Sequence, residues 1–275
     1  MTSTTFTLES PDGTGLHATW SAPESPKATI VLVHGLGEHS GRHAHVAARL
    51  NEAGYAVEQF DLRGHGRSPG ARGDTRFAPT MDDIEAALDD AETRVPGVPR
   101  FIYGHSLGGL LTLTYVLRRR PQLDGVVCSS AGLRSPVLEQ RLKMTAAKLL
   151  GSVLPSVPIP TGLDDNGLSR DPEVVQAYRA DPLVHDKGSL ALGKDGAVGA
   201  DWALANAERF DLPLLMFHGS ADPITYARGT QEFASKVRGD VTVRIYDGLY
   251  HECHNEPEQA QVLDDVVAWL DAHCG

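Results

Sequence analysis

Short apolar runs alternate with amphipathic segments along most of this chain, beginning near residue 28. The runs are rich in Val, Ile and Leu, and several are apolar throughout rather than at every second position. Strands of this kind are buried on both faces, as in a parallel sheet that helices cover on both sides. The six runs are ATIVLVHG (28–35), YAVEQFD (55–61), RFIYG (100–104), LDGVVCSS (123–130), LPLLMFHG (212–219) and VTVRIYDG (241–248).

The segments between the runs have the spacing of helices. Residues 80–95 place apolar side chains every three or four positions, and Asp82, Asp83 and Glu85 lie in the first turn, where the helix dipole favours anions. The C-terminal stretch around residues 262–270 repeats this apolar spacing. Strands alternating with helices predict an α/β layer fold.

The alternation fails between about Leu133 and Phe210. A proline-rich connector, LPSVPIP, interrupts this region at residues 154–160. Its helix-like pieces are residues 137–150, 172–180 and 200–208. We interpret the region as an insertion that caps one end of the sheet. The chain is therefore expected to comprise an N-terminal core part (1–130), a cap (131–205) and a C-terminal core part (206–275).

The first part of this cap, residues 133–163, is basic and apolar. The whole chain has 36 acidic against 25 basic residues, whereas this stretch has four basic residues and one acid, Glu139. One interpretation is that it docks on an anionic bilayer or micelle in the manner of an interfacial helix. The other is that its leucines pack the cap onto the sheet while the charges stay solvated. The basic residues are Arg134, Arg141, Lys143 and Lys148.

Composition excludes several classes of protein. The net charge of −11 argues against a nucleic-acid partner, because phosphate binding depends on clustered Lys and Arg. Cys128, Cys253 and Cys274 are too few and too scattered for a disulfide framework or a zinc site, so we expect no metal. The first residues lack the basic and apolar regions of a signal peptide, and no apolar stretch approaches about 20 residues. We therefore expect a cytoplasmic protein without a transmembrane segment.

The pattern Gly-x-Ser-x-Gly occurs twice, around Ser106 and around Ser68. A nucleophile elbow needs a strand entering the serine, a helix leaving it, small flanking residues and a free N–H on the next residue. The segment RFIYGHSLGGLLTLTYVLRR around Ser106 supplies all of these. The residue after Ser68 is Pro69, which has no N–H to donate. Ser106 is therefore the candidate nucleophile.

A serine hydroxyl needs a base, and the base needs a carboxylate that fixes its tautomer. In a parallel sheet the loops after the strands open on one edge, so these partners should follow later strands. Asp222 follows the run 212–219, and His251 follows the run 241–248. The order Ser106, Asp222, His251 is typical of an elbow-borne nucleophile.

Two other histidines compete for the role of base. His254 lies three residues after His251, and the residues alone separate the two only weakly. His218 lies at the end of a predicted strand, where we expect it to pack against the following turn.

The first run ends in HGLGEH (34–39), whose two glycines let the backbone fold back close to Ser106. The N–H of Leu36 is then a candidate donor to a carbonyl oxygen that becomes negative, and Leu107 is the second. Each donor of such an oxyanion hole contributes about 2.7 to 4 kcal/mol to transition-state stabilisation.

These residues resemble the monoacylglycerol lipase family of α/β-hydrolases, and the matching pieces span most of the chain in the same order. The resemblance implies an eight-stranded, mostly parallel sheet with a cap after strand six. It also implies a serine hydrolase that cleaves monoacylglycerols to fatty acid and glycerol through an acyl-enzyme, without a cofactor. The pieces are HGLGEHSGRH (34–43), DLRGHGRSPG (61–70), GHSLGG (104–109), GSADPI (219–224) and YHECHNEP (250–257).

The resemblance further implies roles for individual residues. It favours His251 over His254 and places the cap along the acyl tunnel. A lipid substrate agrees with the apolar cap, since an acyl chain gains about 0.8 kcal/mol per buried methylene. The residues implied at the polar, glycerol-binding end are Gly35, Glu38, Arg42 and His105.

Three alternatives stay open from the sequence. The same chemistry serves other monoesters, including short-chain and aromatic esters. Peptidase action is less favoured, because the chain shows no obvious acidic cluster for a free peptide N-terminus. From a different class, the chain is a hydrolase-fold protein that binds a small ligand without turning it over.

Overall fold

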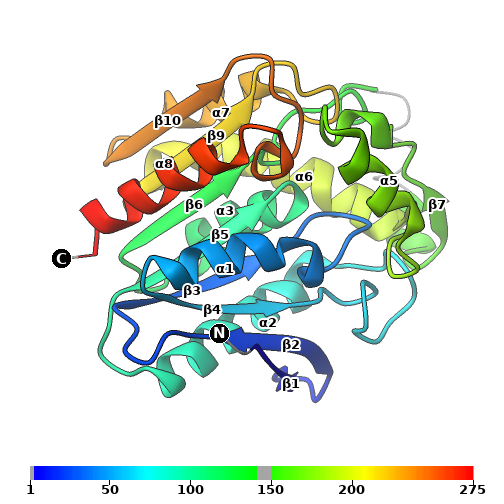
Figure 1. Ribbon diagram of the computed structural model, residues 1–275. Helices are drawn as coiled ribbons and strands as arrows, with labels where there is room; N and C mark the ends of the chain where they lie inside the picture. The colour runs from blue at the N-terminus through cyan, green and yellow to red at the C-terminus, as the bar shows by residue number, and fades with distance from the viewer. Residues whose placement is uncertain (1–2, 141–149, 275) are drawn as a thin grey trace.

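The computed structural model describes residues 3–140 and 150–274. Its main sheet has eight strands in the order β1-β2-β4-β3-β5-β6-β9-β10, and the strands from β4 to β10 are parallel (Figure 1). All six predicted runs form strands of this sheet, so the predicted α/β fold with a mostly parallel eight-stranded sheet is confirmed. The six are β3 (Ala28–Val33), β4 (Tyr55–Phe60), β5 (Arg100–His105), β6 (Gly125–Ser129), β9 (Leu214–Gly219) and β10 (Val241–Tyr246).

The two remaining strands, β1 (Thr4–Glu9) and β2 (Gly15–Ser21), form an antiparallel hairpin that pairs through β2 with β4. Neither stood out as an apolar run. In β1 only Leu8 is buried, while most of its neighbours face solvent. In β2 only Leu16 and Ala18 are buried, so neither strand has a continuous apolar run.

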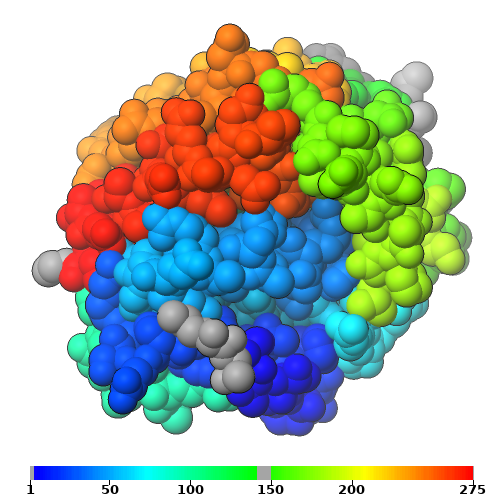
Figure 2. Space-filling view, in the orientation of Figure 1, coloured from blue at the N-terminus to red at the C-terminus, as the bar shows by residue number. Residues whose placement is uncertain are grey.

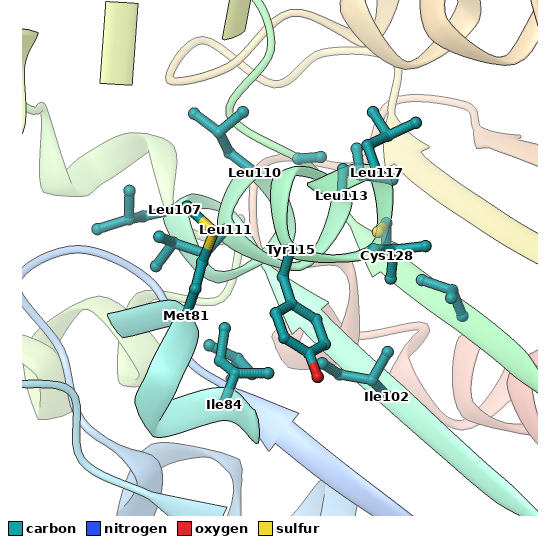
Figure 3. Close-up of a cluster of buried hydrophobic side chains, with 14 of the residues drawn as sticks. Met81, Ile84, Ile102, Leu107, Leu110, Leu111, Leu113, Tyr115, Leu117 and Cys128 are labelled. Atoms are coloured by element: carbon teal, nitrogen blue, oxygen red, sulfur yellow. The ribbon is translucent and has the colours of Figure 1, made fainter. Parts of the chain in front are cut away.

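Helices cover both faces of the sheet. On one face α1 (Ala44–Glu52) and α8 (Gln259–Ala272) bury residues such as Leu50 and Val266 against the strands. On the other lie α2 (Phe77–Arg94), α3 (Leu107–Arg119), α6 (Leu190–Asn206) and α7 (Ala227–Ala234). Figure 3 shows part of this second core, where Ile84 of α2 lies near Tyr115 of α3 and Ile102 of β5.

The segment between β6 and β9 contains the elements expected of an insertion. It holds α5 (Pro172–Ala180) and α6, and β7 (Pro158–Pro160) pairs with β8 (Lys187–Ser189) in a second, two-stranded sheet. In Figure 1, α5 and β7 lie on the side toward which the parallel strands point, and Figure 2, in the same orientation, shows the green residues of α5 at this edge of the molecule. Backbone bonds join this segment to the core: the His185 amide donates to the Gly37 carbonyl at 2.9 Å, and the Glu252 amide donates to the Leu168 carbonyl at 2.8 Å.

The three helices predicted in this segment agree with the structure to different degrees. The prediction for residues 172–180 matches α5. The prediction for 200–208 was too short, because α6 begins at Leu190, and its glycines, which disfavour helices, weakened the sequence signal. The prediction for 137–150 lies mostly outside the described residues, as do the basic residues Arg141, Lys143 and Lys148.

No helix within residues 3–140 and 150–274 combines the length and the apolar composition that a bilayer crossing requires.

Strand β5 and helix α3 meet through glycines that leave no room for a side chain. A β-carbon on Gly108 would lie 2.1 Å from the Val33 carbonyl oxygen, and one on Gly104 would lie 2.5 Å from the Gly108 oxygen. Both contacts are with backbone, which cannot move aside without shifting β3 or α3. The glycines therefore set how closely α3 approaches the sheet.

We predict that Gly108→Ala destabilises the fold by about 3 kcal/mol, because the added methyl group forces the helix away from β3. Gly196→Ala is the matched control, since a β-carbon at Gly196 in α6 would meet nothing within 4 Å. There the exchange should be neutral or stabilising by about 0.5 to 1 kcal/mol. Urea unfolding followed by circular dichroism measures both, and equal midpoints for the two variants would contradict the packing argument.

Candidate active site

Ser106 lies in the sharp turn between β5 and α3. Its φ of 54° and ψ of −114° fall in a region that non-glycine residues rarely occupy. Two backbone bonds hold the turn: the Ser106 amide donates to the Ser129 carbonyl at 2.9 Å, and the Gly132 amide donates to the Ser106 carbonyl at 3.0 Å. Strain of this kind persists where the surroundings over-determine it, as at the elbow of a nucleophile.

The structure brings Ser106, His251 and Asp222 together at the carboxyl edge of the sheet. The Nε2 atom of His251 lies 2.8 Å from the Ser106 hydroxyl oxygen, and Nδ1 lies 2.8 Å from Oδ2 of Asp222. Asp222 follows β9 and His251 follows β10, as the parallel topology requires. Distances of this size allow a proton to pass from the serine to the histidine.

Electrostatics suit the histidine to act as a base. Burial by itself raises the pKa of Asp222, but His251 and a hydrogen bond from His218 outweigh it and hold this pKa well below its usual range. Burial by itself lowers the pKa of His251, but the charge of Asp222 and its hydrogen bond raise it above the ordinary value. The ionised Asp222 keeps the proton on Nδ1 of His251, so Nε2 is free to accept one from Ser106.

His254, the other candidate base near His251 in the sequence, has different surroundings. His254 is buried among the rings of His43 and His105, with centroids 4.9 and 4.8 Å away, and burial holds its pKa well below the ordinary value. Within the described part of the chain neither of its ring nitrogens has a hydrogen-bond partner. His251, not His254, contacts Ser106.

Ser68, the serine of the other Gly-x-Ser-x-Gly pattern, forms hydrogen bonds that connect two parts of the core. Its hydroxyl donates to the Asp61 carbonyl at 2.6 Å and accepts from the His17 amide at 3.0 Å, so it ties β2 to the loop after β4.

The loop after β3 lies close to the elbow. A β-carbon on Gly35 would come within 3.2 Å of the Ser106 β-carbon, and Gly37 adopts a φ of 77°, which favours glycine. The Gly35 amide donates to Oε1 of Glu38 at 2.7 Å, which fixes the start of this loop. Among the described residues the amides of Leu36 and Leu107 donate to no acceptor, so both remain available to a negative oxygen.

Two cavities of opposite character reach Ser106. One has a volume of about 500 Å³ and is lined mainly by apolar side chains, among them Leu138, Ile159 and Leu190. The other has a volume of about 360 Å³ and is rich in charged side chains. Leu36 and Ser106 line both cavities, whereas His251 lines only the charged one.

The residues implied at the polar end, Gly35, Glu38, Arg42 and His105, all line the charged cavity. Arg42 donates to Glu38 at 2.8 Å and to both carboxylate oxygens of Glu252 at 2.6 and 2.7 Å. Glu252 was not among the predicted site residues. The only sequence feature that could have pointed to Glu252 is its position next to His251. Through Glu38 and Glu252, Arg42 links the loop after β3 to the loop that carries His251.

The charged cavity also gathers carboxylates that the sequence did not group: Glu38, Asp165, Asp181, Asp186 and Glu252. Most of them are paired. Arg42 pairs with both Glu38 and Glu252, Arg179 contacts Asp165, and the ring of His39 lies 2.8 Å from Asp181.

Comparison with known proteins shows the family to which the chain belongs. A family model described as "Serine aminopeptidase, S33" (Hydrolase_4) matches residues 24–258. A monoacylglycerol lipase of Mycolicibacterium smegmatis is 38% identical over 92% of this chain and 91% of its own length. The chain belongs to the monoacylglycerol lipase family of α/β-hydrolases.

Two further matches are similar to most of this chain. The crystal structure of Paleococcus ferrophilus monoacylglycerol lipase has a TM-score of 0.87 and 37% identity, covering 94% of this chain and 99% of that one. An uncharacterized abhydrolase domain-containing protein of Dictyostelium discoideum is 37% identical over 92% of this chain, which spans only 27% of that longer protein.

For the two serines we predict opposite outcomes. Ser106→Ala removes the attacking oxygen and should lower ester turnover by on the order of 10⁶, with loss of fluorophosphonate labelling. Ser68→Ala removes two buried hydrogen bonds and should cost about 1 to 2 kcal/mol of stability while labelling persists. Labelling read by intact mass decides the matter: an adduct on the Ser106→Ala chain would show that the reactive hydroxyl lies elsewhere.

Proposed function

We propose that this protein is a monoacylglycerol lipase, which hydrolyses monoacylglycerols to fatty acid and glycerol through an acyl-enzyme on Ser106. The observation that carries the proposal is the meeting of an apolar and a charged cavity at one serine. An ester of a long acyl chain with a small polar alcohol has these two halves on either side of its carbonyl group. The name of the Mycolicibacterium smegmatis relative supports the same substrate.

In the proposed mechanism the Ser106 oxygen attacks the ester carbonyl while His251 takes its proton. Asp222 orients His251 and stabilises the imidazolium that forms. The carbonyl oxygen becomes negative and accepts hydrogen bonds from the Leu36 and Leu107 amides. His251 then gives its proton to the leaving alcohol, and a water repeats the sequence to release the fatty acid.

The position of His251 orients the substrate. As the general acid it must reach the leaving oxygen, and it lines only the charged cavity. The alcohol therefore occupies the charged cavity, near Glu38, Arg42 and His105. The acyl chain occupies the apolar cavity, where each methylene withdrawn from water contributes about 0.8 kcal/mol.

Charge in the alcohol cavity favours a neutral leaving group. Carboxylates outnumber guanidinium groups in its lining by five to two. Glycerol carries no charge, whereas a phosphate monoester carries about −1.5 to −2 at neutral pH. Placing like charges together in a partly buried site costs several kcal/mol, so lysolipids that carry a phosphate monoester are expected to be poor substrates.

We further infer that residues 131–205 act as a cap that contacts lipid surfaces. Val153 and Leu154 are 75% and 51% exposed, and the neighbouring Leu150, Ile159 and Leu163 are also exposed and line the apolar cavity. An exposed apolar patch that continues into an acyl cavity gives a lipid a path out of a bilayer or micelle.

A matrix of substrates tests the proposed reaction. Esters from acetyl to oleoyl are offered with glycerol, methanol or glycerol 3-phosphate as the alcohol. We predict that kcat/KM rises with acyl length, that glycerol exceeds methanol by about tenfold, and that glycerol 3-phosphate falls at least about 10²-fold below glycerol. A maximum at short acyl chains with no glycerol preference would instead favour a general carboxylesterase. Failure of the wild-type chain to turn over any ester would favour a ligand-binding protein.

The lipid-contact surface has its own test. Val153→Asp with Leu154→Asp puts two charges on the exposed patch, which disfavours insertion among lipids. We predict that the double variant cosediments less with vesicles and hydrolyses vesicle-borne monooleoylglycerol about tenfold more slowly. Hydrolysis of water-soluble p-nitrophenyl acetate is the control and should not change. An equal loss on both substrates would place the defect in the catalytic centre rather than at the lipid surface.

A further inference from the structure

His218, the last residue but one of β9, is fully buried behind the Ser106–His251–Asp222 group. Its Nε2 atom lies 2.9 Å from Oδ2 of Asp222 and 3.1 Å from the Thr225 carbonyl oxygen. Its Nδ1 atom lies 2.8 Å from the hydroxyl of Thr230 in α7. The imidazole, which β9 carries, therefore contacts both the loop that contains Asp222 and the following helix, α7.

The neighbours of His218 fix its tautomer. An ionised carboxylate and a backbone carbonyl can only accept hydrogen bonds, so the Nε2 atom between them must carry a proton. Nδ1 is then free to accept from the Thr230 hydroxyl, which has both donor and acceptor capacity. His218 thus presents a fixed N–H to Asp222, and this bond is charge-assisted.

The carboxylate of Asp222 has a full set of donors. Its Oδ1 accepts from the amides of Ile224 and Thr225 at 2.8 and 3.0 Å. Its Oδ2 faces two imidazoles, His251 at 2.8 Å and His218 at 2.9 Å. The Thr225 hydroxyl is also 2.9 Å from Oδ2, but it lies 3.1 Å from the Ser130 carbonyl, which offers its proton another acceptor.

We propose that His218 is a positioning residue for the hydrolysis: its Nε2–H holds the Asp222 carboxylate in place and shares the charge that Asp222 presents to His251. This inference rests on the proposed function. Without His218 the two amides still hold Oδ1, but Oδ2 keeps a single imidazole partner. More of the negative charge of Asp222 then acts on His251, which makes that histidine harder to deprotonate.

The other groups around His251 stay in place when His218 is changed. These are Glu38 on the loop after β3, His105 on β5 with its ring centroid 4.9 Å away, and Glu252 on the loop of His251 itself. None of them contacts His218 among the described residues. A shift in the titration of His251 on changing His218 therefore reports on Asp222.

Two amide substitutions separate the two sides of the His218 ring. In His218→Asn the amide reaches only as far as Nδ1, so the contact with Thr230 is retained and Asp222 loses its donor. In His218→Gln the longer side chain brings an N–H to the place of Nε2. We expect His218→Asn to move the acid limb of kcat/KM about 0.5 to 1 pH unit higher and to lower kcat about tenfold. We expect His218→Gln to restore the wild-type limb.

His65→Asn controls for the loss of any buried histidine. His65 is as deeply buried as His218, but it contacts Thr75, the backbone of Arg63 and the rings of His34 and His185 rather than the triad. The pH profile of the His65→Asn variant should therefore match that of the wild type. Should the His218→Asn chain not fold, Thr230→Val removes the partner of Nδ1 and frees the ring to turn. It should move the acid limb in the same direction by a smaller amount.

The outcomes of the pH profiles, measured on a water-soluble ester, are distinct. A limb that moves upward in His218→Asn and returns in His218→Gln supports the positioning role. Equal limbs in both variants, whether shifted or not, or a downward shift in His218→Asn, would overturn it while ester turnover by the wild type still supports the proposed function. A wild-type chain without turnover or fluorophosphonate labelling would instead contradict the proposed function itself.

Discussion

The turn at Ser106 is the constraint around which the rest of the molecule is arranged. A serine at a φ of 54° has a strained backbone, and such a conformation persists only where the surrounding structure holds it in place. Here β5 enters the turn, α3 leaves it, and glycines at 104 and 108 let the two approach to backbone contact. The carbonyl of Ser129 on the neighbouring strand then fixes the Ser106 amide. The hydroxyl is thereby held at the sheet edge where the loops after the other strands end.

A second set of interactions keeps those loops in register with the serine. Arg42 bridges Glu38, whose carboxylate holds the Gly35 amide, and Glu252, the neighbour of His251. All three side chains are nearly buried, so each charge depends on its partners. Removing one partner of such a group leaves an uncompensated buried charge, which is far more costly than an exposed pair is worth. The loop that carries Leu36 and the loop that carries His251 are in this way coupled.

Much of the fold was predictable from residue patterns alone. Continuous apolar runs are typical of strands buried on both faces, and several of the six runs are of this kind. Together with the helical segments between them, the runs predicted a parallel sheet that helices cover. The hairpin β1–β2 was missed because most of its residues are exposed or only partly buried, so no continuous apolar run marks it. Helix α6 was predicted too short because its glycines lower helix propensity, although Gly199 packs directly on Phe77. Propensity is local, whereas that contact joins residues far apart in the chain.

The sequence by itself determined which groups are present and in what order: a serine between a strand and a helix, followed by an aspartate and a histidine after later strands. It could not choose firmly between His251 and His254 without family resemblance, because three residues of spacing do not say which ring turns toward the serine. Only the tertiary structure shows that His251, not His254, contacts Ser106, and it places His218 behind Asp222 and gathers carboxylates from distant segments into one cavity. Hydrogen bonds depend on direction and separation in space. A residue pattern records which groups exist, whereas the packing of strands, loops and cap sets which of them meet.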